Sequence, residues 1–274
     1  MKFAICNETY QDWPLEKACD HISQCGYDAV EIAPFTLEDD PRRLTEQHAA
    51  DIGRLISSAG LEIVGFHWLL VKPEGLHLTT SDDAVRSATV LFAQHLARLC
   101  GAMGGKILVW GSPQQRNIAV GQGYEDAFAR ATDAIRQIAE TAGPLGVTLA
   151  MEPLSTAETN FLTTAAETVR LIEEVDHPAC QLHLDVKAMC NEEKAIGQII
   201  RENSEHVVHF HANDPNLRGP GFGDVDFEPI ADALRAIRYD AYVSVEVFDY
   251  SPDPETIATE SLKYLRQCFS HSSL

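Results

Sequence analysis

The chain has 274 residues, and its 41 acidic against 21 basic residues give a formal net charge of −20. Because such a chain repels phosphate backbones and anionic lipids, we expect neither nucleic-acid nor membrane-surface binding. Apolar residues make up 45% of the chain and charged residues 23%, which is ordinary for a globular protein and excludes global disorder. The length suits one α/β barrel, a fold that needs about 250 residues.

Membrane insertion and secretion are also disfavoured. The most apolar window, Leu61 to Val71, contains Glu62 and His67 and is far shorter than the ~20 residues that span a bilayer. The N-terminal segment turns polar at Asn7, so it lacks the apolar core of a signal peptide. The seven cysteines include no Cys-x-x-Cys pair, which argues against a disulfide framework. We therefore expect a cytoplasmic protein.

Short apolar runs rich in β-forming residues alternate with amphipathic stretches along the whole chain. The predicted strands are Lys2–Cys6, Ala29–Ala33, Glu62–His67, Lys106–Trp110, Val147–Met151, Gln181–Leu184, Val207–His211 and Tyr242–Val247. The predicted helices between and after them are Leu15–Gln24, Thr45–Ala59, Asp82–Cys100, Tyr124–Ala142, Ala165–Val175, Glu192–Asn203, Pro229–Ile237 and Pro254–Cys268. Pro14 and Pro254 suit the first turn of a helix.

Eight successive strand–helix units predict parallel strands joined by right-handed crossovers. Eight such units close into a single (β/α)8 TIM barrel, so we expect residues 1–274 to form one domain with its active site at the C-terminal ends of the strands. An open doubly wound sheet is the competing fold. It would usually carry Gly-x-Gly-x-x-Gly after its first strand, and this chain has no such motif.

Four consecutive predicted strands end in a side chain that can bind a metal. These side chains are Glu152, Asp185, His211 and Glu246. Adjacent strands lie about 4.8 Å apart, so the four can meet if all point into the barrel. The residues two positions earlier share that face and are small or polar, namely Ala150, His183, His209 and Ser244. The intervening residues, Met151, Leu184, Phe210 and Val245, are apolar and should pack under the helices.

Three carboxylates packed together repel one another strongly, and a divalent cation removes that repulsion. Carboxylate oxygens with one imidazole nitrogen suit Mn²⁺, Mg²⁺ or Co²⁺, with Zn²⁺ as a further option. We therefore predict one divalent metal ion held by Glu152, Asp185, His211 and Glu246. The alternative is a metal-free polar barrel mouth in which the charges pair with one another.

Further residues near the strand ends have weaker assignments. Glu31 either orients a metal ligand from behind or is a buried paired acid. His183 and His209 are expected to line the barrel interior behind the ligands. His67 could bind a substrate hydroxyl or be a satisfied core histidine. Trp110 could form an apolar wall of the binding site or pack in the core.

The sequence resembles the xylose isomerase-like TIM-barrel superfamily, in its branch of sugar phosphate isomerases and epimerases, and within it the ketose 3-epimerases. The motifs that carry the resemblance are Glu152-Pro153-Leu154, Glu158-Thr159-Asn160-Phe161-Leu162, His183-Leu184-Asp185, His211-Ala212-Asn213-Asp214-Pro215-Asn216, Gly219-Pro220-Gly221-Phe222-Gly223-Asp224 and Val245-Glu246. The resemblance implies that Glu152, Asp185, His211 and Glu246 bind one divalent metal. It also implies that Glu152 and Glu246 exchange a proton alpha to a carbonyl through a cis-enediolate.

One position departs from the family pattern. Family epimerases usually carry Asp-x-x-His after the sixth strand, whereas this chain has Ala188 in place of that histidine. Lys187 could replace it in contacting substrate, or be a salt-bridged loop lysine. Glu158 is kept from the family motif and is a second substrate-contact candidate. Arg218, in the loop after the seventh strand, could clamp a hydroxyl or phosphate or lie on the surface.

These features predict an isomerase, a metal-dependent sugar isomerase or epimerase that acts on a ketose or related polyol, phosphorylated or not. A polyol dehydratase of the inosose type is the second enzyme hypothesis, because it would begin with the same proton abstraction. A barrel that binds metal and sugar without turnover is the hypothesis that involves no catalysis. A three-zinc abasic-site endonuclease on this barrel is disfavoured, since Trp110 and Ala188 stand where it needs histidines. The expected partner is a small sugar, and a homo-oligomer remains open.

Overall fold

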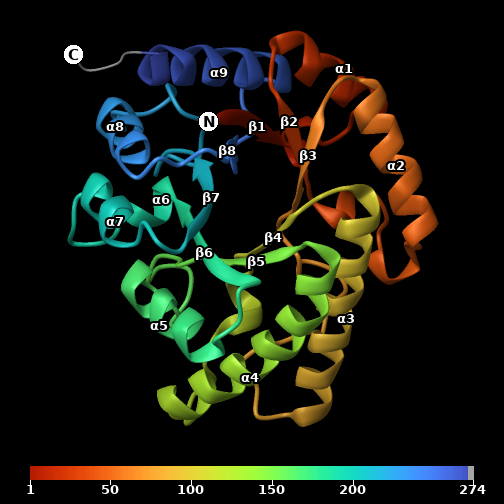
Figure 1. Ribbon diagram of the computed structural model, residues 1–274, viewed down its shortest axis with the longest axis vertical. Coiled ribbons are helices and arrows are strands. Elements are labelled where there is room, and N and C mark those ends of the chain that lie inside the picture. Colours follow the sequence, from red (N-terminus) through yellow and green to blue (C-terminus); the bar gives the residue numbers. More distant parts are fainter. Residues whose placement is uncertain (271–274) are drawn as a thin grey trace.

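In the computed structural model, which describes residues 1–270, eight parallel strands close into a barrel in chain order, with β8 beside β1 (Figure 1). The strands are β1 (Lys2–Cys6), β2 (Ala29–Ile32), β3 (Glu62–Phe66), β4 (Ile107–Trp110), β5 (Thr148–Met151), β6 (Cys180–Asp185), β7 (Val207–Ala212) and β8 (Tyr242–Val245). The predicted (β/α)8 barrel is confirmed. The prediction of one domain for residues 1–274 includes residues 271–274, which lie outside the described part.

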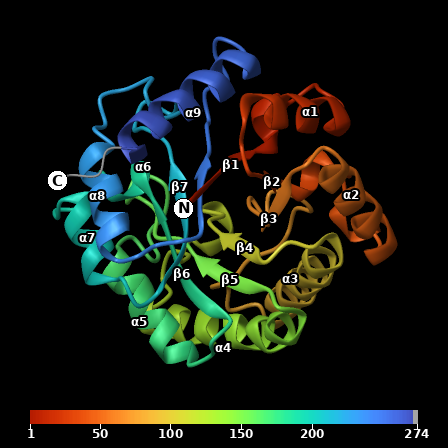
Figure 2. The ribbon, with the colours of Figure 1, turned by 45° about the horizontal axis from the view of Figure 1, so that its top comes forward.

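Helices form an outer ring around the strands, as Figure 2 shows. They are α1 (Leu15–Cys25), α2 (Glu46–Ser58), α3 (Asp83–Met103), α4 (Tyr124–Ala142), α5 (Ala165–Val175), α6 (Val186–Met189), α7 (Ile196–Glu202), α8 (Glu228–Ala236) and α9 (Pro254–Ser270). Side-chain caps fix several starts: Asp82 accepts from the N–H groups of Ala84 and Val85 at the start of α3.

One predicted helix differs from the structure. The segment expected as Glu192–Asn203 is helical only over α7, and the short α6 precedes it directly after β6. The Asp185 carboxylate accepts from the Ala188 N–H and thereby starts α6. Glu192 stays outside a helix because its carboxylate accepts instead from the Ala165 N–H at the start of α5. The first contact is a local cap, whereas the second joins segments 27 residues apart, which helical periodicity cannot reveal.

The two faces of the strands divide as their alternation predicts. Met151, Leu184, Phe210 and Val245 belong to the hydrophobic core between the barrel and the helices. The register places Asp185 beside His211, and His211 beside Ser244, so polar residues of adjacent strands share the interior face. Burying polar groups in a barrel interior lowers the free energy of unfolding unless the groups are paired. Their presence here therefore indicates a functional role for this end of the barrel.

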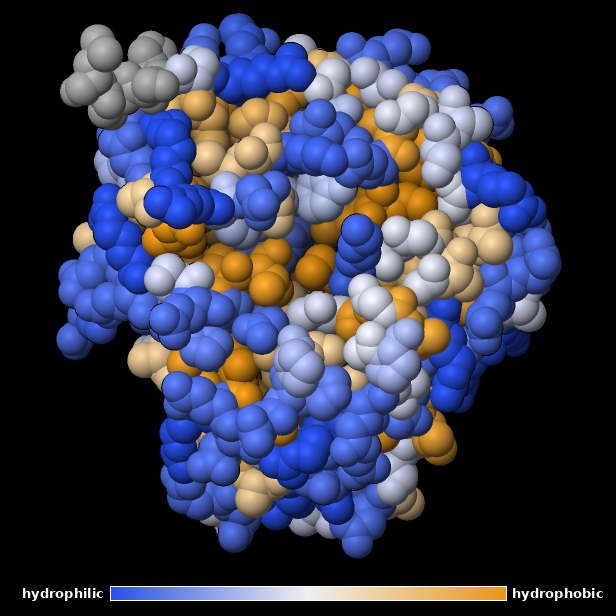
Figure 3. Space-filling view, in the orientation of Figure 1, coloured by the Kyte–Doolittle hydropathy of each residue, from blue (hydrophilic) through white to orange (hydrophobic). Residues whose placement is uncertain are grey.

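Hydrophilic side chains predominate on the face drawn in Figure 3, and the apolar ones gather in the middle of that view. This distribution agrees with the strongly acidic composition. Within residues 1–270, no helix combines the length and the apolar character that crossing a membrane requires.

Candidate active site

Four acidic and imidazole side chains meet where the last four strands end. Glu152 directly follows β5, Asp185 ends β6, His211 lies near the end of β7 and Glu246 directly follows β8. All four are buried, with at most 7% of any of them exposed. His211 Nδ1 lies 3.1 Å from Glu246 Oε2. One donor atom each of Glu152, Asp185 and His211 lies within 4.8 Å of the others.

The carboxylates of this cluster repel one another. Burial, together with the charges of Asp185 and Glu246, raises the pKa of Glu152 well above its usual value. Burial also raises the pKa of Asp185 to about 6, and Glu246 adds to that shift. The pKa of Glu246 is lowered in spite of its burial, because His211 supplies a positive charge and a hydrogen bond. A divalent cation at this point would relieve the repulsion.

Two of the four donors lie at a separation that one ion can bridge. Two neighbouring donors of an octahedral ion with bonds of about 2.1 Å lie about 3 Å apart, close to the separation of His211 Nδ1 and Glu246 Oε2. His183 also faces the cluster. Its Nε2 lies 3.9 Å from Glu152 Oε1, and neither of its buried nitrogens has a hydrogen-bond partner among the described residues. A buried imidazole nitrogen without a partner is costly, and a bound cation or a water molecule on that cation could supply the missing partner.

A second layer of paired groups lies beneath the cluster. The buried Glu31 carboxylate contacts His211 Nε2 at 3.1 Å and His209 Nε2 at 2.9 Å. Its pKa is held well below the usual value, since the two imidazoles outweigh the effect of burial. The carboxylate on Nε2 holds the His211 ring with its Nδ1 facing Glu246. Glu31 and His209 thus lie behind His211 in the barrel interior.

A pocket of about 390 Å³ opens above the cluster. Glu152 and Glu246 both line it, together with Glu158 and Lys187. Lys187 Nζ donates to Glu158 Oε1 at 2.6 Å and lies 4.8 Å from the centre of the Phe248 ring. Lys187 therefore forms a salt bridge, as one of its two interpretations expected, and that salt bridge lies in the pocket wall.

Gly111, at the end of β4, permits the position of Glu152. A Cβ atom on Gly111 would lie 1.7 Å from Glu152 Oε2, so any side chain there would displace the carboxylate. The Glu152 side chain is thus packed against bare backbone, which limits its motion.

A family model described as xylose isomerase-like TIM barrel matches residues 19–268. The chain belongs to this family. It is 28% identical to the L-ribulose 3-epimerase of Mesorhizobium japonicum, over 85% of this chain and 75% of that protein. It is also 28% identical to the D-psicose 3-epimerase of Agrobacterium fabrum, over 84% of this chain and 78% of that protein. Epimerases are isomerases, so the predicted enzyme class is confirmed.

Solved structures agree on the fold. An L-ribulose 3-epimerase superposes with a TM-score of 0.87 at 23% identity, covering 98% of this chain and 94% of that one. A 3-keto-D-glucoside 4-epimerase from Escherichia coli superposes with a TM-score of 0.85 at 22% identity, covering 98% of this chain and all of that one. At this level of identity, the likeness supports the barrel and not a particular substrate.

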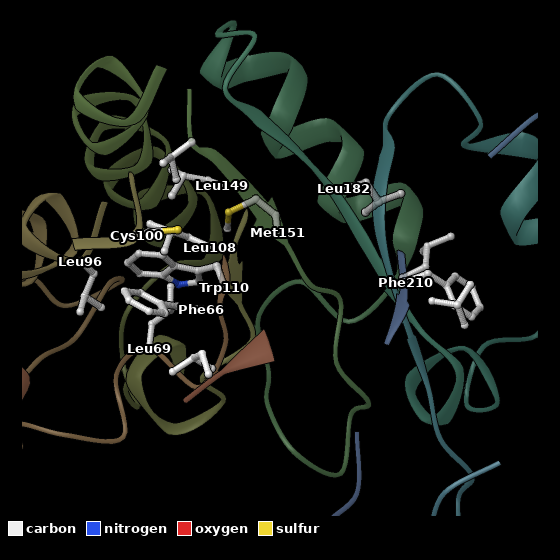
Figure 4. Packing of buried hydrophobic residues seen from close by; sticks show 14 of the residues in the cluster. Phe66, Leu69, Leu96, Cys100, Leu108, Trp110, Leu149, Met151, Leu182 and Phe210 are labelled. Carbon is white, nitrogen blue, oxygen red and sulfur yellow. The ribbon is translucent and has the colours of Figure 1, made fainter. Parts of the chain in front are cut away.

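The structure corrects three predicted substrate contacts, none of which lines the pocket. Trp110 is buried outside the barrel, among Phe66, Leu108 and Met151 (Figure 4). Its register partner is Met151, so it shares the helix-facing side of the sheet. The expected apolar wall at Trp110 is therefore wrong.

His67 and Arg218 are also engaged elsewhere. His67 Nε2 lies 2.7 Å from Glu8 Oε2 in the buried layer, which agrees with the interpretation as a satisfied core histidine. Arg218 donates to the Ser251 carbonyl at 3.2 Å and packs over the Phe222 ring. These contacts hold the half-buried Arg218 between its own loop and the loop after β8, outside the pocket lining.

Sequence reasoning missed three residues that hold members of the acidic cluster in place. Trp68 Nε1 donates to Glu246 Oε1 at 2.9 Å, and Asn213 Nδ2 donates to Asp185 Oδ2.

Arg116 is completely buried, and its guanidinium donates at 2.7 Å to the main-chain carbonyls of both Glu152 and Trp110. Asn213 stands two residues after His211, which is a signal that could have indicated it. Trp68 and Arg116 lie in loops whose path no strand pattern reveals.

Replacing Arg116 is expected to displace Glu152. Arg116 joins the ends of β4 and β5, and burial lowers its pKa to about 10. Arg116→Lys keeps a charge but loses the fork that reaches both carbonyls, so we expect kcat to fall about tenfold. Arg116→Met removes one donor from each carbonyl, although the Trp110 carbonyl keeps the Glu152 N–H, and it should lower the free energy of unfolding by about 1–3 kcal/mol. Kinetics and urea unfolding measure the two effects; full kcat in both variants would contradict this role.

Proposed function

We propose that this protein is a divalent-metal-dependent epimerase that inverts a carbon next to the carbonyl of a ketose. The arrangement of Glu152 and Glu246 carries this proposal. Both carboxylates line one pocket, and they come from β5 and β8, which β6 and β7 separate. Two carboxylates that reach a substrate from different sides can exchange protons on opposite faces of one carbon.

In the proposed reaction, one glutamate removes the proton alpha to the carbonyl, and the resulting cis-enediolate takes a proton from the other glutamate on its opposite face. Trp68 holds Glu246 by a hydrogen bond, and Gly111 provides the space against which Glu152 rests. Glu152, Asp185, His211 and Glu246 would hold the cation, with Glu31 orienting His211. The bound cation would polarise the substrate's carbonyl and hydroxyl oxygens, which lowers the barrier to proton removal.

Glu158 and Lys187 are proposed to contact substrate hydroxyls. Their salt bridge lies in the pocket wall and presents both an acceptor and a donor. The pKa of Glu158 is lowered despite its burial, because Lys187 donates to it, so the pair stays ionised. Neither a cytoplasmic location nor a homo-oligomer has been tested, and both stay predictions.

Lys187→Met is expected to raise KM for the ketose about tenfold, since it removes a charged donor and leaves Glu158 unpaired in the pocket. The effect on kcat should be smaller, because the two acid–base glutamates keep their positions. The exposed Lys263→Met on α9 is a matched control. Steady-state kinetics check this prediction, and a KM equal to that of the control would contradict it.

Proton NMR of a ketose panel in deuterated buffer with Mn²⁺ tests the proposed function. Epimerisation predicts deuterium at the carbon next to the carbonyl and a new epimer with the carbon skeleton retained. Loss of water would instead favour the dehydratase hypothesis. Saturable thermal stabilisation by a ketose with no exchange at all would favour the barrel without turnover.

A further inference from the structure

The pocket has two chemically different halves. All of its charged lining residues follow β5, β6 or β8, namely Glu152, Glu158, Lys187 and Glu246. The residues from β3, β4 and the loops after them carry no charge, namely Trp68, Val71, Val109, Gly111, Ser112, Pro113, Gln114 and Gln115. We call this second set the uncharged arm. Since the proposed chemistry uses the charged half, the arm is available for another part of the substrate.

An aromatic stack borders the uncharged arm. Trp68 lies between Phe35 and Phe248, with ring centres 5.8 Å apart on each side and interplanar angles of 29° and 21°. All three side chains are only half-buried, so aromatic surface is exposed at the barrel mouth beside the polar site. Trp68 also has a positive φ of 51°, an unfavourable conformation for a bulky residue that the surrounding structure must maintain.

The composition of the arm defines what it can bind. Val71, Pro113 and the part of the stacked indole that stays exposed offer apolar surface, which suits the C–H face of a sugar ring. Ser112, Gln114 and Gln115 add uncharged hydroxyl and amide groups for hydroxyls. Among the described residues that line the pocket, Lys187 is the only cation, and Glu158 already pairs with it. A phosphate placed in the arm would therefore meet no positive charge.

The pocket is large enough for a ligand of drug-like size. Its volume of about 390 Å³ lies within the range of roughly 300–1,000 Å³ that is typical of sites for drug-sized ligands. The acid cluster occupies one side of this volume, and the arm extends the pocket toward β3 and β4.

We infer that the uncharged arm binds a second, uncharged sugar ring, so that the substrate is a glycosylated ketose and not a phosphorylated one. This inference rests on the proposed epimerase function and names its substrate class. Trp68 is then a specificity-determining residue: the part of its ring that Phe35 and Phe248 leave exposed borders the second sugar, and its Nε1 holds Glu246. Binding in the arm would thereby be coupled to the placement of the acid–base group.

The test compares ketoses that share one reacting part. D-Fructose, D-fructose 6-phosphate, and fructose bearing a second hexose at O4 or at O6 are assayed by deuterium exchange next to the carbonyl. We expect kcat/KM for at least one glycosylated ketose to exceed that for D-fructose tenfold or more. D-Fructose 6-phosphate should be the poorest of the set. If D-fructose exchanges but every glycosylated ketose is slower, the inference is overturned while the proposed function stands.

Three variants locate the effect. Trp68→Leu should remove the preference for the glycosylated ketose, whereas Trp68→Phe should keep that preference and lower kcat for all substrates, because only the Nε1–H bond is lost. Val71→Lys alters an arm residue that is 41% exposed, so folding should tolerate it. It should raise kcat/KM for D-fructose 6-phosphate relative to D-fructose at least threefold. Wild-type preferences in both Trp68→Leu and Val71→Lys would overturn the inference.

If no ketose exchanges deuterium, the proposed function has failed, and binding still tests the arm. Thermal stabilisation is then measured with the same four compounds. Saturable stabilisation by a glycosylated ketose at concentrations tenfold below those needed for D-fructose, lost in Trp68→Leu, supports the arm. Equal or weaker stabilisation contradicts it.

Discussion

Glu246→Gln is expected to lower kcat by about 10³-fold or more, because it removes an acid–base group without changing its size. The glutamine can still accept the hydrogen bond from Trp68 Nε1 through its amide oxygen. It cannot accept a proton from carbon or return one. At a saturating Mn²⁺ concentration, which offsets the loss of one carboxylate ligand, KM for the ketose should change by less than about threefold, since the pocket shape is kept.

Two comparisons make this experiment decisive. Glu152→Gln should also abolish epimerisation, and if the two glutamates serve opposite faces, each variant should lose exchange from one epimer more than from the other. The exposed Glu140→Gln on α4 is the matched control and should retain wild-type kcat. More than about a tenth of wild-type kcat in Glu246→Gln would contradict the acid–base role, since general acid–base groups contribute about 10²-fold or more.

Removal of divalent metal is expected to reduce epimerase activity to background. Without a cation, Glu152, Asp185 and Glu246 are left with like charges close together, as the raised pKa values of Glu152 and Asp185 show. Dialysis against a chelator should therefore also lower the Tm. Adding back Mn²⁺, Mg²⁺ or Co²⁺ should restore both the Tm and the activity in a saturable manner.

Asp185→Asn provides the matched variant for this second experiment. The asparagine keeps the size of the side chain and removes one negative donor, so the Mn²⁺ concentration for half-maximal Tm shift should rise at least about tenfold. Full activity after exhaustive chelation, with the metal content measured as zero, would contradict metal dependence. A Tm insensitive to Mn²⁺ in both proteins would contradict the metal site itself.

The barrel and the cluster at the strand ends could be predicted from the sequence, because both follow from the local alternation of residues along each strand. A strand has a period of two, so the face of Glu152 also fixes the face of Met151 beside it. Parallel closure then brings the ends of β5 to β8 together without any knowledge of loops. All four predicted ligands lie at the predicted strand ends for this reason.

The residues of the pocket walls were harder to predict from the sequence, because loops and pairs of distant side chains form these walls. Trp110 ends a strand, yet its register with Met151 turns it away from the pocket. The same alternation, applied to β4, would have identified Val109 as the inward residue, and it does line the pocket. No such rule exists for Trp68 or Arg116, whose partners Glu246 and Glu152 are 178 and 36 residues distant in the chain.

Anomalous diffraction from crystals soaked in Mn²⁺ tests the central claim most directly. The account predicts one strong peak at the barrel mouth, bonded to Glu152, Asp185, His211 and Glu246 and absent from crystals of Asp185→Asn at the same Mn²⁺ concentration. Binding only at surface carboxylates, with those four side chains free of the ion, would contradict it.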